Sequence, residues 1–147
     1  MNLGAPGGTN VKGVVPFLCV SNMEQSVRYY LDGLGFAMSH KWVIDGKLRW
    51  CWLTLGGAAL MLQEFAREGH DSWTAQGKVG EGVSLYFFCE DAVRIYHELR
   101  SRSIEASEPQ VGNRMWVTSL SDPDGYSLHF ESPTDVAEET KLSEMKG

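Results

Sequence analysis

The pattern of apolar and polar positions predicts a strand, a helix and three further strands in the first half of the chain. The expected elements are a strand at 14–20, a helix from Met23 to about Gly33, and strands at 36–44, 48–55 and 58–65. Ser21 and Glu24 have the Ser-x-x-Glu form of a capping box, which predicts where the helix begins. Asp45-Gly46 is typical of a hairpin turn.

The same order returns in the second half. The expected elements are a strand at 83–89, a helix at 91–102, a weaker strand opening at Ile104, and strands at 115–120 and 126–131. Apolar and turn positions recur at a nearly fixed offset, so that Leu60 corresponds to Leu128 and Leu18 to Phe87. We therefore predict an α+β fold of tandem βαβββ modules that form a curved mixed sheet around a cavity.

This repeat sets the expected division of the chain. The predicted segments are a flexible N-terminal tail at 1–12, a first module at 13–66, an inter-module linker at 67–82, a second module at 83–132 and a polar C-terminal tail at 133–147. The linker is polar and glycine-punctuated, and a short helical turn within it is compatible with its sequence.

Charge and hydropathy argue against two classes of partner, nucleic acids and membranes. The net charge is −6 and the pI is about 5.2, which argues against nucleic acid because phosphate binding needs clustered Lys and Arg. No apolar run approaches the roughly 20 residues of a membrane helix, and the start of the chain does not resemble a signal peptide. Three widely spaced cysteines lie in apolar runs, as free thiols do. We expect a cytoplasmic protein without a membrane partner.

Two stretches carry a family resemblance: VVPFLCVSNMEQSVRYYLDGLGF from Val14 and SDPDGYSLHFES from Ser121. With the internal repeat, they resemble the vicinal oxygen chelate superfamily, which contains glyoxalase I, extradiol dioxygenases and bleomycin-resistance proteins. The resemblance covers Val14 to Ser132. It implies a U-shaped sheet around a cavity and a homodimer.

The resemblance also implies where a metal would bind, with one ligand on the first and one on the last strand of each module. Those positions map to Val15, Met61, Val83 and His129. Apolar side chains cannot ligate a hard divalent cation, and a thioether suits soft metals only. We therefore predict no metal and no other cofactor. A divalent metal remains the alternative, held by His129 with further ligands among Gln63, Glu64, His70 and Glu131.

In a pocket without a metal, aromatic side chains could hold the ligand by direct contact, since they offer large rigid faces to flat or cationic compounds. The predicted ligand-binding residues are Phe17, Trp42, Trp50, Trp52, Met61, Gln63, Phe87, Trp116, His129 and Glu131. By alternation Trp50 and Trp52 share one strand face, where they form either a stacking platform or a packing surface in the core or a dimer interface. Val83, Leu85 and Phe87 are expected to face the cavity.

His129 and Glu131 stand two residues apart on one strand and point the same way. They could act as base and orienter or grip a polar group of a ligand; alternatively His129 is a buried histidine with a satisfied hydrogen bond. The resulting hypothesis is a metal-free protein, similar to bleomycin-resistance proteins, that sequesters an aromatic or cationic compound. The alternative is a glyoxalase-like lyase or isomerase or a dioxygenase, metal-dependent or using His129 as acid and base. A purely structural or partner-binding module is a further possibility.

Overall fold

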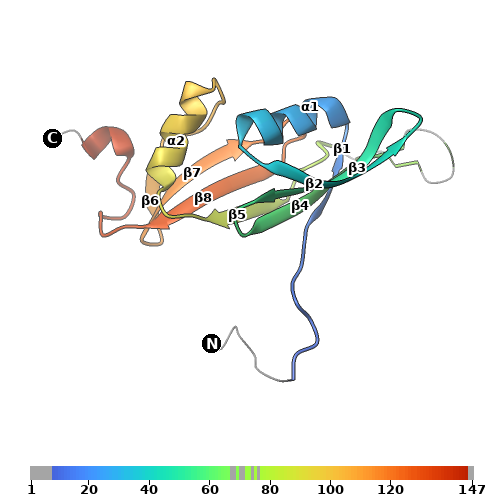
Figure 1. Cartoon of the computed structure of the whole chain (residues 1–147). Coiled ribbons are helices and arrows are strands. Elements are labelled where there is room, and N and C mark those ends of the chain that lie inside the picture. The colour runs from blue at the N-terminus through green and yellow to red at the C-terminus, as the bar shows by residue number, and fades with distance from the viewer. Residues whose placement is uncertain (1–7, 67–68, 70–71, 74, 76, 146–147) are drawn as a thin grey trace.

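The protein consists of two four-stranded sheets laid side by side, with one main helix of each half above them (Figure 1). The computed structural model describes residues 8–66, 69, 72–73, 75 and 77–145. The first half contains β1 (Phe17–Val20), α1 (Met23–Arg28), η1 (Tyr29–Gly33), β2 (Ala37–Ile44), β3 (Lys47–Leu55) and β4 (Ala58–Glu64). The second half contains β5 (Ser84–Phe88), α2 (Ala92–Ser101), β6 (Gln110–Gly112), β7 (Met115–Ser121), β8 (Ser127–Pro133) and the 3-10 turn η2 (Leu142–Met145).

Both sheets have the same topology. Their strand orders are β1-β4-β3-β2 and β5-β8-β7-β6. The first strand of each half runs parallel to the last, and the remaining pairs are antiparallel. This is the predicted α+β architecture of two βαβββ modules. Among the described residues, no helix is long and apolar enough to cross a membrane.

A single core lies between the helices and the sheets and draws on both modules. Alternate strand residues such as Leu62 and Leu128 point into it and are fully buried. A chain of ring contacts crosses from one module to the other: Tyr30 to Phe36 at 5.5 Å, Phe36 to Phe87 at 6.1 Å, and Phe87 to Phe130 at 4.8 Å between centroids. The two halves are therefore packed as one unit.

A polar seam also joins the modules, at the turn between β7 and β8. The buried carboxylate of Asp122 accepts a 2.7 Å hydrogen bond from the Tyr30 hydroxyl and further bonds from the backbone N–H groups of Asp124 and Tyr126. Asp124 in turn accepts from the Ser21 hydroxyl at 2.6 Å. Burial is the main cause of a raised pKa for Asp122, opposed by these hydrogen bonds.

The start of α1 corrects one prediction. The N-cap is Asn22, whose side chain accepts from the Gln25 N–H, rather than Ser21 of the expected capping box. Ser21 is turned toward Asp124 across the seam instead. The Ser21 side chain thus forms a long-range hydrogen bond to the buried carboxylate of Asp124 instead of capping α1.

The strand expected to open at Ile104 is absent, and the second strand of this module begins at Gln110 as β6. Ile104 packs against the core, and its side chain lies so close to Gly33 that an added Cβ there would meet it at 2.9 Å. The segment before β6 is poor in strand-forming residues. Packing of the Ile104 side chain against the core therefore determines the course of the backbone there.

Candidate small-molecule site

The faces of the two sheets that the helices do not cover carry the candidate site. In the first sheet, core residues such as Leu60 and Leu62 alternate with side chains on the open face. We call this open face the aromatic face; it consists of Phe17, His40, Trp42, Trp50, Trp52, Met61 and Gln63.

Strand register places these side chains in two rows. Phe17 lies opposite Met61, and Met61 lies opposite Trp52. In the next row, Trp42 and Trp50 are partners across β2 and β3. Phe17 is 47% exposed and Trp42 is 54% exposed, which is unusual for rings of this size within strands of one face. The aromatic face is thus a broad apolar surface open to solvent.

The open face of the second sheet differs in chemistry. We call it the polar face; it consists of Tyr86, Phe88, Ser119, His129 and Glu131. The rings of Tyr86 and His129 are stacked at 4.6 Å with an angle of 21°. The Ser119 hydroxyl lies 2.8 Å from Nδ1 of His129. Tyr86 and Phe88 are 55% and 75% exposed.

This arrangement fixes the histidine ring from two sides. Ser119 engages Nδ1, and the Tyr86 ring covers one face of the imidazole. Among the described residues, Nε2 has no hydrogen-bond partner, so it is the ring nitrogen left for a ligand. Depending on its tautomer, Nε2 can donate to or accept from a polar group.

Most of the predicted ligand-binding residues lie on these two faces, but two do not. Phe87 points to the core side, where it stacks on Phe130, and Leu85 shares that side. Trp116 pairs with the buried Ser132 and shares the helix-covered side with Thr118. Leu85 and Phe87 are expected to face the cavity; in the structure they lie on the core side of β5, opposite to Tyr86 and Phe88, and they also border a hollow between the modules.

Two of the four positions where the family would place a metal lie in strands, and the register gives their neighbours. Phe17 lies opposite Met61, and Tyr86 lies opposite His129. A thioether at Met61, aromatic rings at Phe17 and Tyr86, and a single imidazole at His129 do not make a ligand set for a hard divalent cation. Within the described ranges, no group of three or more His, Cys, Asp or Glu side chains could hold a metal ion.

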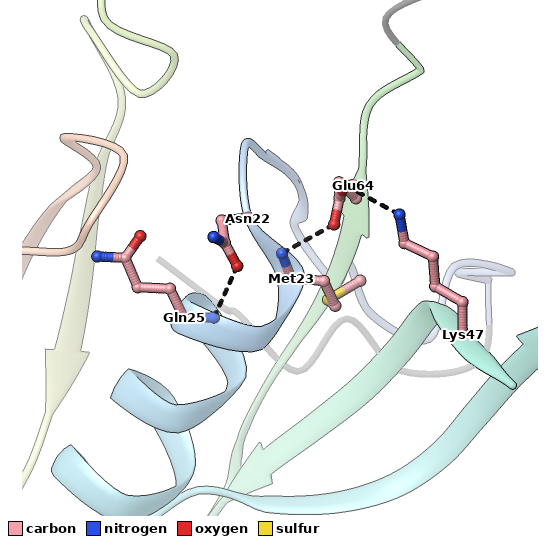
Figure 2. Close-up of polar contacts among 5 residues, drawn as sticks. All are labelled: Asn22, Met23, Gln25, Lys47 and Glu64. Carbon is pink, nitrogen blue, oxygen red and sulfur yellow. Dashed lines mark hydrogen bonds and ion pairs between the residues drawn. The ribbon is translucent and has the colours of Figure 1, made fainter.

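The alternative ligands are scattered. Gln63 is on the aromatic face and Glu131 on the polar face, whereas His70 lies outside the described residues. Glu64 turns to the helix side, where it accepts a 3.0 Å hydrogen bond from the Met23 N–H and pairs with Lys47 at 3.5 Å (Figure 2). Its role is to hold the start of α1.

Three residues of the polar face are not among those predicted from the sequence: Tyr86, Phe88 and Ser119. The repeat itself contains the signal, since the offset that equates Leu18 with Phe87 equates Phe17 with Tyr86. Ser119 occupies the place of Trp52, as the partners of the equivalent residues His129 and Met61 show. Its hydrogen bond to His129 depends on pairing across β7 and β8, which spacing along one strand does not reveal.

These features agree with comparisons to known proteins. A profile of the Glyoxalase/Bleomycin resistance protein/Dioxygenase superfamily matches residues 13–130. The chain belongs to this superfamily. A search of curated protein sequences finds no match.

Solved structures with this fold include proteins of different roles. TnmS3, an antibiotic binding protein from Streptomyces sp. CB03234, is 18% identical with a TM-score of 0.65 and covers 86% of this chain and 99% of its own. The bleomycin resistance determinant encoded on transposon Tn5 is 17% identical with a TM-score of 0.64, covering 86% and 100%. Lactoylglutathione lyase from Agrobacterium tumefaciens is 15% identical with a TM-score of 0.62, covering 84% and 96%. At these identities, the likeness concerns the fold.

Proposed function

We propose that this protein binds and sequesters a small planar aromatic or cationic compound, without a metal, on the open faces of its two sheets. The observation that carries the proposal is the aromatic face, where tryptophans of neighbouring strands and an exposed Phe17 form one surface. Flat rings stack favourably on such side chains, and cations are attracted to indole faces.

The polar face supplies the directional contacts. His129, held by Ser119 and Tyr86, offers Nε2 to a polar group of the ligand. Glu131, on the same face, offers a carboxylate to a positive group, in keeping with the net charge of −6. The antibiotic-binding and bleomycin-resistance proteins among the structural neighbours support this class of ligand. We further propose a homodimer in the cytoplasm.

Tryptophan fluorescence tests the proposal. Titration with bleomycin and with other planar cationic compounds is expected to give saturable quenching, because the ligand lies against Trp50 and Trp52. Trp73, which lies outside the strands of both sheets and packs edge-on against Phe65, serves as a control. Quenching should persist in Trp73→Phe and fall sharply in Trp52→Phe. Absence of saturable quenching with every compound would contradict the proposal.

One observation favours a second candidate, an enzyme that uses His129 as acid and base. The hydrogen bond between the Ser119 hydroxyl and Nδ1 is the kind of support that orients a catalytic imidazole. A glyoxalase-like reaction would then depend on His129 and survive a chelator, whereas a metal-dependent lyase or dioxygenase would purify with a stoichiometric metal. Elemental analysis, followed by assays of His129→Ala with and without chelator, separates these cases.

A further inference from the structure

The chain after β8 returns to the outer edge of the second sheet. Figure 1 shows η2 beside β6. Gln110 of β6 forms an antiparallel bridge with Lys141. Two backbone hydrogen bonds of 2.9 Å flank the bridge, one from the Val111 N–H to the Thr140 carbonyl and one from the Leu142 N–H. β6 is therefore paired on both sides, with β7 and with this segment.

Two carboxylates hold the segment before and after the bridge. Glu138 accepts hydrogen bonds from the N–H groups of Asn113 at 2.8 Å and Arg114 at 3.1 Å, in the turn between β6 and β7. Glu108 accepts from the N–H and the hydroxyl of Ser143 at 3.0 and 3.3 Å. Hydrogen bonds to a charged acceptor are stronger than those between neutral groups. The bridge is thus held from both ends.

The register shows which face of the sheet Lys141 joins. Residues that are paired across strands place their side chains on the same face. Glu131 lies opposite Val117, and Val117 lies opposite Gln110. Gln110 lies opposite Lys141, whereas the next residue, Val111, is buried on the core side. Lys141 therefore lies on the side of the polar face, in the row that contains Glu131.

Lys141 adds an ammonium group to a face that has an imidazole and a carboxylate. Its side chain is exposed, and among the described residues no ion pair engages it, whereas Lys47 pairs with Glu64 at 3.5 Å. Neighbouring strands lie about 4.8 Å apart, so the Cα atoms of Lys141 and Glu131 are about 14 Å apart along the row. The positive and negative groups thus lie at different places on the face, with the apolar Val117 between them.

We propose that Lys141 is a further binding residue of the small-molecule site and that the ligand is a planar aromatic compound with an acidic group. An ammonium group is a compact positive charge with three donors, which suits a carboxylate, sulfonate or phosphate. The acidic group meets Lys141, and the ring lies over Val117 beside His129. A positive group at the other end of the ligand can meet Glu131. The inference rests on the proposed function, because it concerns the same open faces.

The test uses the full-length chain and two probes with the same ring system, anthracene-9-carboxylate and 9-anthracenemethanol. Fluorescence anisotropy of each probe measures its dissociation constant. Lys141→Gln should weaken binding of the carboxylate by about fivefold, the upper range for one exposed charge pair, and leave the affinity for the alcohol unchanged. Lys141→Arg should keep the affinity for the carboxylate, because it keeps the positive charge.

Lys41→Gln is the matched control. Lys41 is an exposed residue of β2, the outer strand of the first sheet, and it lies opposite the buried Cys51, hence on the helix side. The substitution removes the same charge and should change neither affinity. Equal effects of Lys141→Gln on the two probes, equal effects of the two glutamine variants, or no binding of the carboxylate to the wild type would overturn the inference.

Titration with bleomycin, followed by tryptophan quenching, separates this inference from the proposed function. If the anthracene carboxylate gives one of the contradicting results while bleomycin still quenches saturably, the role of Lys141 fails and the proposed function stands. If Lys141→Gln weakens binding of the carboxylate alone, both are supported.

Discussion

The open faces of the two modules show how one backbone plan carries different surface chemistry. Equivalent strand positions hold Trp52 in the first sheet and Ser119 in the second, and Met61 in the first and His129 in the second. The core-facing residues that follow Met61 and His129 in their strands, Leu62 and Phe130, are both large and apolar. Burial constrains the inner side chains of both modules, whereas the outer ones are free to differ.

Under the proposed function, the two sheets would contribute differently to ligand binding. The first sheet offers ring area with few polar groups, and the second offers a histidine with a fixed ring, a hydroxyl and a carboxylate. A ligand that touches both would gain affinity from the first and orientation from the second.

The modules differ again in how the turn before the last strand is held. In the first module Gly57 has open space around its Cα, with no atom within 4 Å of an added Cβ. In the second, Asp122 is buried and receives hydrogen bonds across the seam. The second turn thus acts as the anchor between modules.

The largest expected effect comes from breaking that anchor. Asp122→Ala leaves the Tyr30 hydroxyl and two backbone N–H groups without their acceptor, and should lower the free energy of unfolding by about 3 kcal/mol. Gly57→Ala at the equivalent turn should change it by less than about 0.5 kcal/mol. Urea denaturation measures both. Similar effects of the two substitutions would contradict the contrast between the turns.

The next effect concerns ligand affinity. Trp52→Ala should weaken binding of a quenching compound by about tenfold, which corresponds to the upper range for one aromatic contact. Ser119→Ala at the equivalent place should weaken it by about threefold, because it frees the His129 ring without removing ring area. Fluorescence titration of both variants gives the comparison. A larger loss for Ser119→Ala would reverse the proposed division between the faces.

A smaller effect distinguishes how the two helices are attached. The Ala92 N–H at the start of α2 donates to the buried Ser132 hydroxyl at 2.8 Å, whereas the Met23 N–H at the start of α1 donates to the partly exposed Glu64. Ser132→Ala should cost about 1 kcal/mol, and Glu64→Gln less than about 0.5 kcal/mol because it keeps an acceptor and loses only a surface ion pair. Thermal unfolding of both variants would show the order, and a larger shift for Glu64→Gln would refute it.

The smallest effect is a pH dependence. Burial raises the pKa of Asp122 above its ordinary value, so the folded protein takes up this proton before the unfolded chain does. The contribution of Asp122 to stability therefore grows as the pH falls from neutral toward the ordinary aspartate range, and is lost as the pH rises through the folded-state value. Compared with Asp122→Asn, the wild type should gain relative stability on acidification, as urea denaturation at several pH values would reveal. A relative loss would contradict the direction of the shift.

Much of this fold could be predicted because the same pattern of apolar and turn positions occurs twice in the chain, once in each module. Turn glycines, apolar alternation and the helix spacing agree between the halves, and the repeat of Leu60 at Leu128 fixes the topology. The exceptions are sites where distant contacts prevail over local signals. Asn22 caps α1 because Ser21 bonds to Asp124, and Ile104 follows the core because of its contact near Gly33.

The candidate site was harder to predict, because the side on which a strand residue lies changes with a slip of one position. Trp50 and Trp52 share one face, as alternation predicts, since both belong to a long, regular strand. Phe87 and Trp116 lie on the core side, although an aromatic side chain alone gives no indication of its face. The Ser119–His129 pair needs the register of β7 and β8, which only the folded chain defines.

The central claim is that a ligand is held on the open faces by ring contact. Nuclear magnetic resonance of the labelled protein during titration with bleomycin tests it most directly. We predict shifts of the indole N–H signals of Trp50 and Trp52 and of the imidazole signals of His129, with little change at Trp73. Shifts confined to residues away from both open faces would contradict the claim.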